Sequence, residues 1–434
     1  MENASDGPAA PENTGKDYKC RIYRAINGTP SENMSKVMDL MGGIEQFIGA
    51  EDIVLIKPNV QWWNQGASNI AALNTLVRLI MQHPGGFTGE VVIFENCHRN
   101  AAPWNAKNTG WLPVFERNAD LAHANNYNTL AASLKAAYGD RFSVVHLLDV
   151  DKGGRRIYGP QDGSGYVYCD GSGGMPLIEL DNGAKAGHFR KTVMTYPIFT
   201  TDRKTRVDFK NGVWANGTYT GQPLKFINFS ALNHHSTYCG ATSAVKNYLG
   251  ISDLSGGPDP QTNGRLTGAS YYNFHSFALD KWAPGPAAGM IGAEVAVFMN
   301  TIRKADLNIT TAEWVGLVSR TEAPAAQTRA LLACKDPVAL DYHAAKYVLY
   351  PNSGIALHNP DEPTRPLHRY LDECAARQGG ILDESQVRLT SYDIAENRLQ
   401  KEKERIVKAA VSWGANLKMF IKYALLRNGL GFIR

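Results

Sequence analysis

Cysteine is scarce in this chain of 434 residues: there are six, spaced far apart and with no Cys-x-x-Cys pair. They are Cys20, Cys97, Cys169, Cys239, Cys334 and Cys374. In a chain of this size, that spacing excludes a disulfide framework and an iron–sulfur cysteine motif. Reduced thiols are therefore expected.

Long apolar runs and a strong charge of one sign are also missing. No stretch reaches the roughly 18 apolar residues of a membrane span, and a net charge of +4 is too small to indicate a nucleic-acid-binding face. Residues 1–17 have neither a basic start nor an apolar run, which predicts a disordered leader instead of a signal peptide. A soluble, cytoplasmic protein without a nucleic-acid partner is expected, and an export signal removed from a longer precursor is the alternative.

Motifs for common reactions are absent as well. The chain has no Gly-x-Ser-x-Gly elbow of a serine hydrolase and no Walker-type phosphate loop. The Gly-x-Gly-x-x-Gly fingerprint does not follow the first predicted buried strand, which disfavours a dinucleotide fold. The motifs therefore leave the reaction undefined.

Strand and helix patterns alternate along the first third of the chain. Residues 51–60 and 89–96 form apolar, β-branched runs typical of buried strands, and 68–83 between them has a helical apolar face with Ser68 as the expected cap. A third buried strand is predicted at 141–150. A strand–helix–strand order indicates that the two strands pair in parallel. We therefore expect an α/β protein with a mostly parallel sheet flanked by helices.

The sequence pattern changes between residues 151 and 222, where Gly- and Asn-rich turns separate short runs of alternating apolar and polar residues. Tight turns at Asn211-Gly212 and Asn216-Gly217 predict consecutive hairpins, hence an antiparallel β-rich insertion. A Gly/Pro/Asn-rich stretch at 255–290 predicts a lid or surface loop. The core resumes with a strand at 224–230, a helix at 242–249, a helix at 292–304 and a strand at 306–315. A further strand and helix are predicted within 331–351, with Asp336 as the helix cap and Pro337 at the first helical position.

The predicted domain organisation is a leader at 1–17, one α/β core at 18–395 and a basic amphipathic helix at 396–434. The apolar stripe of that helix includes Ile406 and Trp413. We expect it to pack on the core or on a second copy of the chain. Peripheral contact with an anionic membrane is the alternative, because basic residues outnumber acidic ones there.

Polar side chains follow several of the predicted parallel strands, where ligands bind in open α/β sheets. Lys57 and Asn59 end the first of the strands described above, and Glu95 ends the next. Lys57 follows four apolar residues, so its ammonium is expected to hold a phosphate or carboxylate, or to titrate low enough to act as a base. A lysine that reaches solvent or pairs with Glu95 is an equally valid reading.

The segment Asn233–Gly250, NHHSTYCGATSAVKNYLG, allows three interpretations. The first is a zinc or iron site that uses the ligands His98, His234, His235 and Cys239, although this spacing matches no common structural zinc pattern. The second is an anion site at the free N–H groups of a helix that follows Gly240, with Lys246 one turn further on. The third is an ordinary turn.

Four blocks together resemble the family known as domain of unknown function 362. They are VLIKPNV, EVVIFEN, NHHSTYCGATSAVKNYLG and LLACKDPVALD, within residues 50–395. The matching positions are Lys57, Pro58, Asn59, His235, Lys246, Asn247, Gly250, Asp336, Pro337 and Asp341. The resemblance implies the fold and the site positions but no reaction. The chain departs from the family at Leu232-Asn233-His234-His235, where relatives often have Leu-Lys-x-His, and it lacks the ferredoxin-like cysteine cluster of many relatives.

The leading hypothesis is an enzyme that acts on a small anionic molecule. Lys57 and Lys246 would bind the anionic group, and His235 would transfer a proton with Glu95 as its partner. Asn59, Asn233 and Asn247 complete the expected ligand-binding set. If a metal is present, lyase or redox chemistry is expected. The alternative is a metal- or ligand-binding accessory protein without turnover, and Asp336 and Asp341 are expected to be structural, Asp336 as a helix cap and Asp341 as a first-turn charge of the same helix.

Overall fold

The computed structural model describes residues 17–98, 100–184, 190–255 and 287–409, together with 411, 412, 421, 424 and 425. Residues 1–16 of the predicted leader lie outside the described residues. So do most of the predicted lid at 255–290 and most of the chain beyond 412.

The main sheet has the strand order β19-β18-β1-β17-β16-β13-β2-β3-β4, and the short strand β20 pairs with β17. Its strands are β1 (Cys20–Ile26), β2 (Ile53–Pro58), β3 (Glu90–Asn96), β4 (Phe142–Leu147), β13 (Leu224–Ala231), β16 (Leu307–Gly316), β17 (Ala325–Cys334), β18 (Val387–Asp393), β19 (Arg398–Leu399) and β20 (Val411–Ser412). From β16 to β4 all neighbours are parallel, whereas β17 runs antiparallel to both β16 and β1. The expectation of an α/β protein with a mostly parallel sheet is confirmed.

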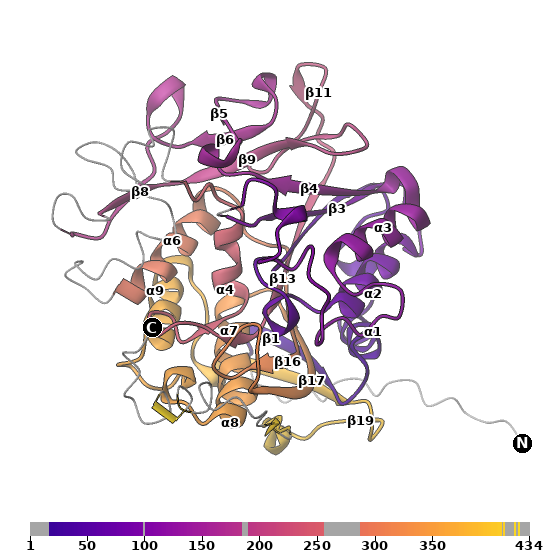
Figure 1. The fold of residues 1–434 in the computed structure, drawn as a ribbon, viewed down its shortest axis with the longest axis vertical. Coiled ribbons are helices and arrows are strands. Elements are labelled where there is room, and N and C mark those ends of the chain that lie inside the picture. Colours follow the sequence, from indigo (N-terminus) through magenta and orange to yellow (C-terminus); the bar gives the residue numbers. More distant parts are fainter. Residues whose placement is uncertain are drawn as a thin grey trace, which may run out of the picture.

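Helices cover both faces of this sheet (Figure 1). One face carries α1 (Pro30–Leu40), α2 (Ile70–Met81) and α3 (Tyr127–Tyr138), and the other carries α4 (Ala244–Asn247), α6 (Ala287–Thr301), α7 (Pro337–Ala344) and α9 (Pro366–Gln378). A short helix, α8 (Tyr350–Ser353), follows α7. Each face has its own buried apolar cluster. The molecule is thus a three-layer arrangement, which buries both faces of a parallel sheet.

Helix α2 begins one residue later than the sequence indicated. Its cap is Asn69, whose side chain accepts a hydrogen bond from the N–H of Ala72 at 3.0 Å. Ser68 instead donates to the carbonyl of Phe229 at 2.7 Å, which joins the start of α2 to β13. Serine and asparagine are comparable caps in isolation, so this tertiary contact decides between them.

The insertion forms a second sheet of order β12-β11-β10-β9-β6-β5, beside a two-stranded sheet of β7 and β8. Its strands are β5 (Arg156–Ile157), β6 (Gly165–Tyr168), β7 (Glu179–Asp181), β8 (Lys191–Val193), β9 (Thr195–Thr200), β10 (Arg206–Asp208), β11 (Gly212–Ala215) and β12 (Thr218–Tyr219). Asn216 and Gly217 both have positive φ, 51° and 81°, so this hairpin turn is the predicted one. The β10–β11 loop is longer than predicted and spans residues 209–211. In Figure 1 the insertion lies along one end of the main sheet.

The described part of the predicted C-terminal helix is not an α-helix between residues 396 and 412. This segment contains β19, a 3-10 turn at Glu402–Glu404 and β20. The buried guanidinium of Arg24 donates to the carbonyls of Arg405 and Glu404, at 2.5 and 3.2 Å. A helix would direct these carbonyls into its own hydrogen bonds, so the tertiary contacts with Arg24 prevail over the amphipathic pattern.

No helix in the described part of the chain is long and apolar enough to cross a membrane.

Candidate functional site

A cavity of about 240 Å³ opens at the carboxyl ends of β2, β3 and β13. Its lining is rich in basic and amide side chains. The lining residues are Lys57, Asn59, Gln61, Trp62, Glu95, Asn96, His98, His235, Ser236, Thr242, Lys246, Asn247, Leu249, Gly250, Leu254 and Arg320. Six residues of the predicted catalytic and ligand-binding set therefore meet at one cavity, together with His98 of the predicted metal set.

Lys57 and Glu95 form a buried ion pair at the base of the cavity. The Nζ of Lys57 lies 2.9 Å from Oε2 of Glu95, and both side chains are 2% exposed. Burial is the largest influence on each group: it lowers the pKa of Lys57 and raises that of Glu95 to about 8, while their mutual attraction opposes both shifts. Burial thus brings the pKa values of the acid and the base toward each other.

A chain of buried amides fixes the position of the lysine. Asn247 of α4 accepts from Lys57 Nζ at 2.7 Å and donates to the carbonyl of Lys57 at 3.1 Å. Its amide also donates to Asn228 on β13 at 2.7 Å, and Asn228 donates to Asn308 on β16 at 2.9 Å. Because every amide has a partner, the ammonium of Lys57 is held in one orientation.

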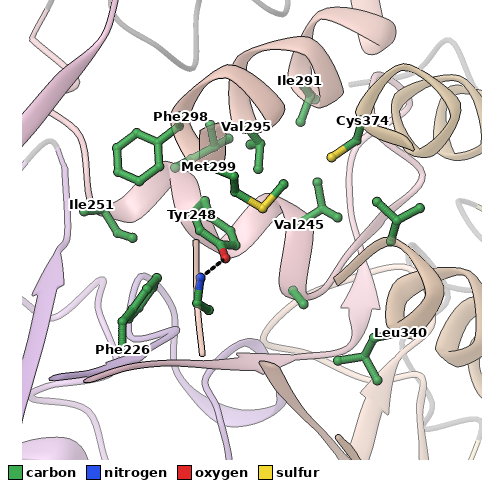
Figure 2. Packing of buried hydrophobic residues seen from close by; sticks show 14 of the residues in the cluster. Phe226, Val245, Tyr248, Ile251, Ile291, Val295, Phe298, Met299, Leu340 and Cys374 are labelled. Atoms are coloured by element: carbon green, nitrogen blue, oxygen red, sulfur yellow. Dashed lines mark hydrogen bonds between the residues drawn. The ribbon is translucent and has the colours of Figure 1, made fainter. Parts of the chain in front are cut away.

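Apolar packing anchors the short helix that carries Lys246 and Asn247. The ring of Tyr248 packs against Phe226 of β13 and Phe298 of α6, with centroids 5.7 and 6.1 Å away, and Val245 lies in the same buried cluster (Figure 2). The Tyr248 hydroxyl accepts a hydrogen bond from the N–H of Ala305 at 2.9 Å.

Lys246, held by this helix, lines the cavity with only 8% of its surface exposed. The pKa of its ammonium is lowered to about 8, with burial as the largest cause; Arg320 acts in the same direction, while Cys239 and Glu294 oppose the shift. Lys246 is therefore a cation whose charge responds to small changes in its surroundings.

The start of α4 does not offer the free N–H groups that the sequence suggested. The helix begins at Ala244, two residues later than predicted. The N–H groups of Ala244 and Val245 donate to the two carboxylate oxygens of Asp341 on α7, at 2.7 and 2.9 Å. The protein thus supplies its own anion at this position, and the predicted helix-start anion site is wrong. Asp341 caps α4 and is not simply a first-turn charge of its own helix, whereas Asp336 caps α7 as expected.

His235 contacts a guanidinium at the cavity. Its Nε2 lies 3.0 Å from Nη1 of Arg320, while its Nδ1 lies 3.1 Å from Oγ of Ser236. Arginine can only donate, so Nε2 accepts in this contact. The guanidinium also stacks on Trp62, with its Cζ 4.3 Å from the ring centroid. In this arrangement His235 and Trp62 orient Arg320. The Nε2 lone pair of His235, which proton transfer would require, points at the guanidinium of Arg320.

The four predicted metal ligands do not come together. His98 and His235 line the cavity, but Nδ1 of His234 lies 2.9 Å from Nε2 of the buried His358. Cys239 is fully buried, and burial raises the pKa of its thiol. Among the residues that the structure describes, no group of three His, Cys, Asp or Glu side chains could hold a metal ion.

Asn59 and Asn233 have different surroundings. Asn59 lines the cavity, and its backbone N–H donates to Ser68 Oγ at 2.9 Å. Asn233 is fully buried away from the cavity lining, where its side chain bonds the carbonyl of Gln65 and accepts from the N–H of Gly316 at 2.8 Å. Asn233 therefore joins three chain segments behind the cavity.

Arg320 and Trp62 line the cavity but were not singled out for the site in the sequence. Arg320 lies in the loop after β16, and Trp62 lies in the loop after β2. The rule that ligands bind beyond the carboxyl ends of parallel strands (the strand-end rule) therefore indicates both loops, but it does not identify the residues within them. Asn96 ends β3 and donates to Asp149, Tyr166 and the carbonyl of Ser252, at 2.6, 2.9 and 2.9 Å. It therefore connects the cavity wall to the insertion.

No family model, curated protein or solved structure matches this chain. The site is therefore interpreted from its own geometry.

Proposed function

We propose that the protein is a small-molecule enzyme that binds a phosphate- or carboxylate-bearing ligand in the cavity at the ends of β2, β3 and β13. The observation that carries this proposal is the charge of the lining. Lys57, Lys246 and Arg320 contribute three basic groups, and the only acidic side chain among the described lining residues is Glu95, which is already paired with Lys57. A small anion would neutralise this excess with charge-assisted hydrogen bonds.

The Lys57–Glu95 pair supports turnover over mere binding. Its two pKa shifts bring an acid and a base toward the same pH, a condition that efficient proton transfer requires. Asn247 restrains the lysine, so the pair is preorganised before a ligand enters. We assign proton transfer to this pair, and His235 becomes a positioning residue for Arg320.

Membership of the domain of unknown function 362 family is part of the same proposal. The positions that carry the resemblance include Lys57, Asn59, His235, Lys246 and Asn247, all of which line the cavity. Positions that match a family for reasons of function are expected to gather in this way.

The first experiment is titration calorimetry with inorganic phosphate and with malonate at pH 8. The variants are Lys246→Met and Arg320→Met, and the matched control is Lys36→Met on the outer side of α1. Loss of one charge-assisted contact costs about 1.5–3 kcal/mol, so each cavity variant should bind roughly 10- to 150-fold more weakly. Lys36→Met should bind like the wild type.

Proton uptake separates specific binding from surface attraction. An anion beside Lys246 raises the pKa of this lysine from about 8, so binding at pH 8 should take up as much as about half a proton from this group. The uptake is measured from the dependence of the binding enthalpy on the buffer, and it should fall in Lys246→Met. Equal affinity of the wild type and both cavity variants, or no binding of either anion, would overturn the proposal, while binding without proton uptake would favour the accessory-protein alternative.

A further inference from the structure

A pair of thiols lies outside the cavity lining, between two neighbouring strands of the main sheet. The Sγ of Cys20, at the start of β1, is 3.1 Å from the Sγ of Cys334, at the end of β17. The two strands are antiparallel neighbours, so 314 positions of sequence separation are closed by sheet pairing. A disulfide bond needs a separation of about 2.05 Å, so the sulfurs must approach by about one ångström more.

The two thiols differ in access. Cys20 is partly exposed, whereas Cys334 is 1% exposed and accepts a hydrogen bond from the N–H of Asp336 at 3.3 Å. The other four cysteines are buried. A reagent in solution therefore reaches Cys20 first, and Cys334 is within reach of any adduct formed there.

We propose that Cys20 and Cys334 form a redox-active pair that a low-molecular-weight disulfide converts to an intramolecular disulfide bond. The Cys20 thiolate attacks the reagent disulfide RSSR, which forms a Cys20–S–S–R bond and releases RS⁻. The Cys334 thiolate then attacks Cys20 Sγ, forms the protein disulfide and releases the second RS⁻. The two protein thiols are oxidised, RSSR is reduced to two RSH, and the two thiol protons pass to the released thiolates.

The bond would tie β1 to β17. In the main sheet β1 is the link between β17 and the terminal strands β18 and β19, so its attachment governs whether that edge stays docked. Closing so long a loop restricts the unfolded chain strongly. The oxidised protein should therefore unfold at a higher temperature than the reduced protein.

The test exposes the reduced full-length chain to oxidised glutathione and measures free thiols in denaturant, with peptide mapping by mass spectrometry without reduction. Titratable thiols should fall by two from the six in the sequence, with a peptide that links Cys20 to Cys334. Cys20→Ser should lose no thiol. Cys334→Ser should retain one glutathione on Cys20, because the resolving thiol is gone.

Cys374→Ser is the matched control, since it removes another buried cysteine and should still form the bond. Retention of all six thiols in the wild type would overturn the proposal, as would a stable glutathione adduct on Cys20 with Cys334 intact. If Cys334→Ser fails to fold, Cys20→Ser alone still decides, because thiol loss in that variant would contradict the pairing.

Discussion

The buried pair of Lys57 and Glu95 makes a prediction about stability and pH that two single substitutions can test. Lys57→Met leaves Glu95 buried without its cation, and burial then raises the pKa of this carboxyl without opposition. Glu95→Gln leaves Lys57 buried without its anion, and burial then lowers the pKa of this ammonium without opposition. The two variants should therefore respond to pH in opposite directions.

The signs follow from the protons that each state binds. In Lys57→Met, Glu95 is protonated in the folded protein but ionised in the unfolded chain, whose pKa is 4.5, over a window that reaches at least to pH 8. The folded state binds more protons there, so stability is greatest at low pH and is lost as pH rises. In Glu95→Gln the unfolded chain binds more protons at Lys57 between the lowered folded pKa of this group and the unfolded pKa of 10.5, so stability rises with pH over that window.

A difference of one whole proton between the two states corresponds to about 1.4 kcal/mol per pH unit, hence at most roughly 4 kcal/mol between pH 5 and pH 8. Both groups line a cavity of about 240 Å³, so partial solvation should reduce this to about 2 kcal/mol for each variant. In the wild type the two contributions oppose each other. Other buried carboxyls, such as Asp149 and Asp253, add the same slope to all three proteins, and the comparison with wild type removes it.

The measurement is the free energy of unfolding in urea at four pH values from 5 to 8, for the wild type and both variants. Relative to the wild type, Lys57→Met should lose stability as pH rises and Glu95→Gln should gain it. Parallel pH dependences for the three proteins would refute the assignment of Lys57 and Glu95 as a coupled, desolvated pair.

The strand-end rule predicted part of the cavity lining from the sequence. Lys57 and Glu95 come from runs that read as buried strands, and parallel pairing of β2 with β3 brings their carboxyl ends together. The same argument brought His235, Lys246 and Asn247 to this edge, because β13 pairs with β2. Local sequence patterns were sufficient to predict that these residues lie together, because parallel pairing of the strands places their carboxyl ends side by side.

Three features needed information that local patterns do not carry. His234 and His235 were predicted to act together, but neighbouring residues of an extended segment point to opposite sides, so one contacts His358 and the other the cavity. Asp341 was assigned to its own helix because sequence distance hides that α4 lies against α7. The C-terminal pattern was amphipathic, yet the carbonyls of residues 404 and 405 are engaged by Arg24, which is about 380 residues away in the chain.

Two further substitutions probe how the surroundings hold the cavity. A Cβ added at Gly250 would lie 2.6 Å from Nζ of Lys57, so Gly250→Ala should cost about 1–3 kcal/mol of unfolding free energy, and Lys57→Met in the same chain should relieve part of that cost. Asp341→Asn keeps the shape of the side chain but has one acceptor oxygen for the two N–H groups at the start of α4. One buried donor is then left without its partner, at about 1–3 kcal/mol, and the displaced helix should weaken phosphate binding through Lys246. Asp336→Asn is the control, because it perturbs the cap of α7 and the contact with the N–H of Ile381, none of which lines the cavity, and it should retain phosphate affinity. If Asp341→Asn binds phosphate as tightly as Asp336→Asn in titration calorimetry, the position of α4 does not depend on the carboxylate of Asp341, and the cap has no influence on the cavity.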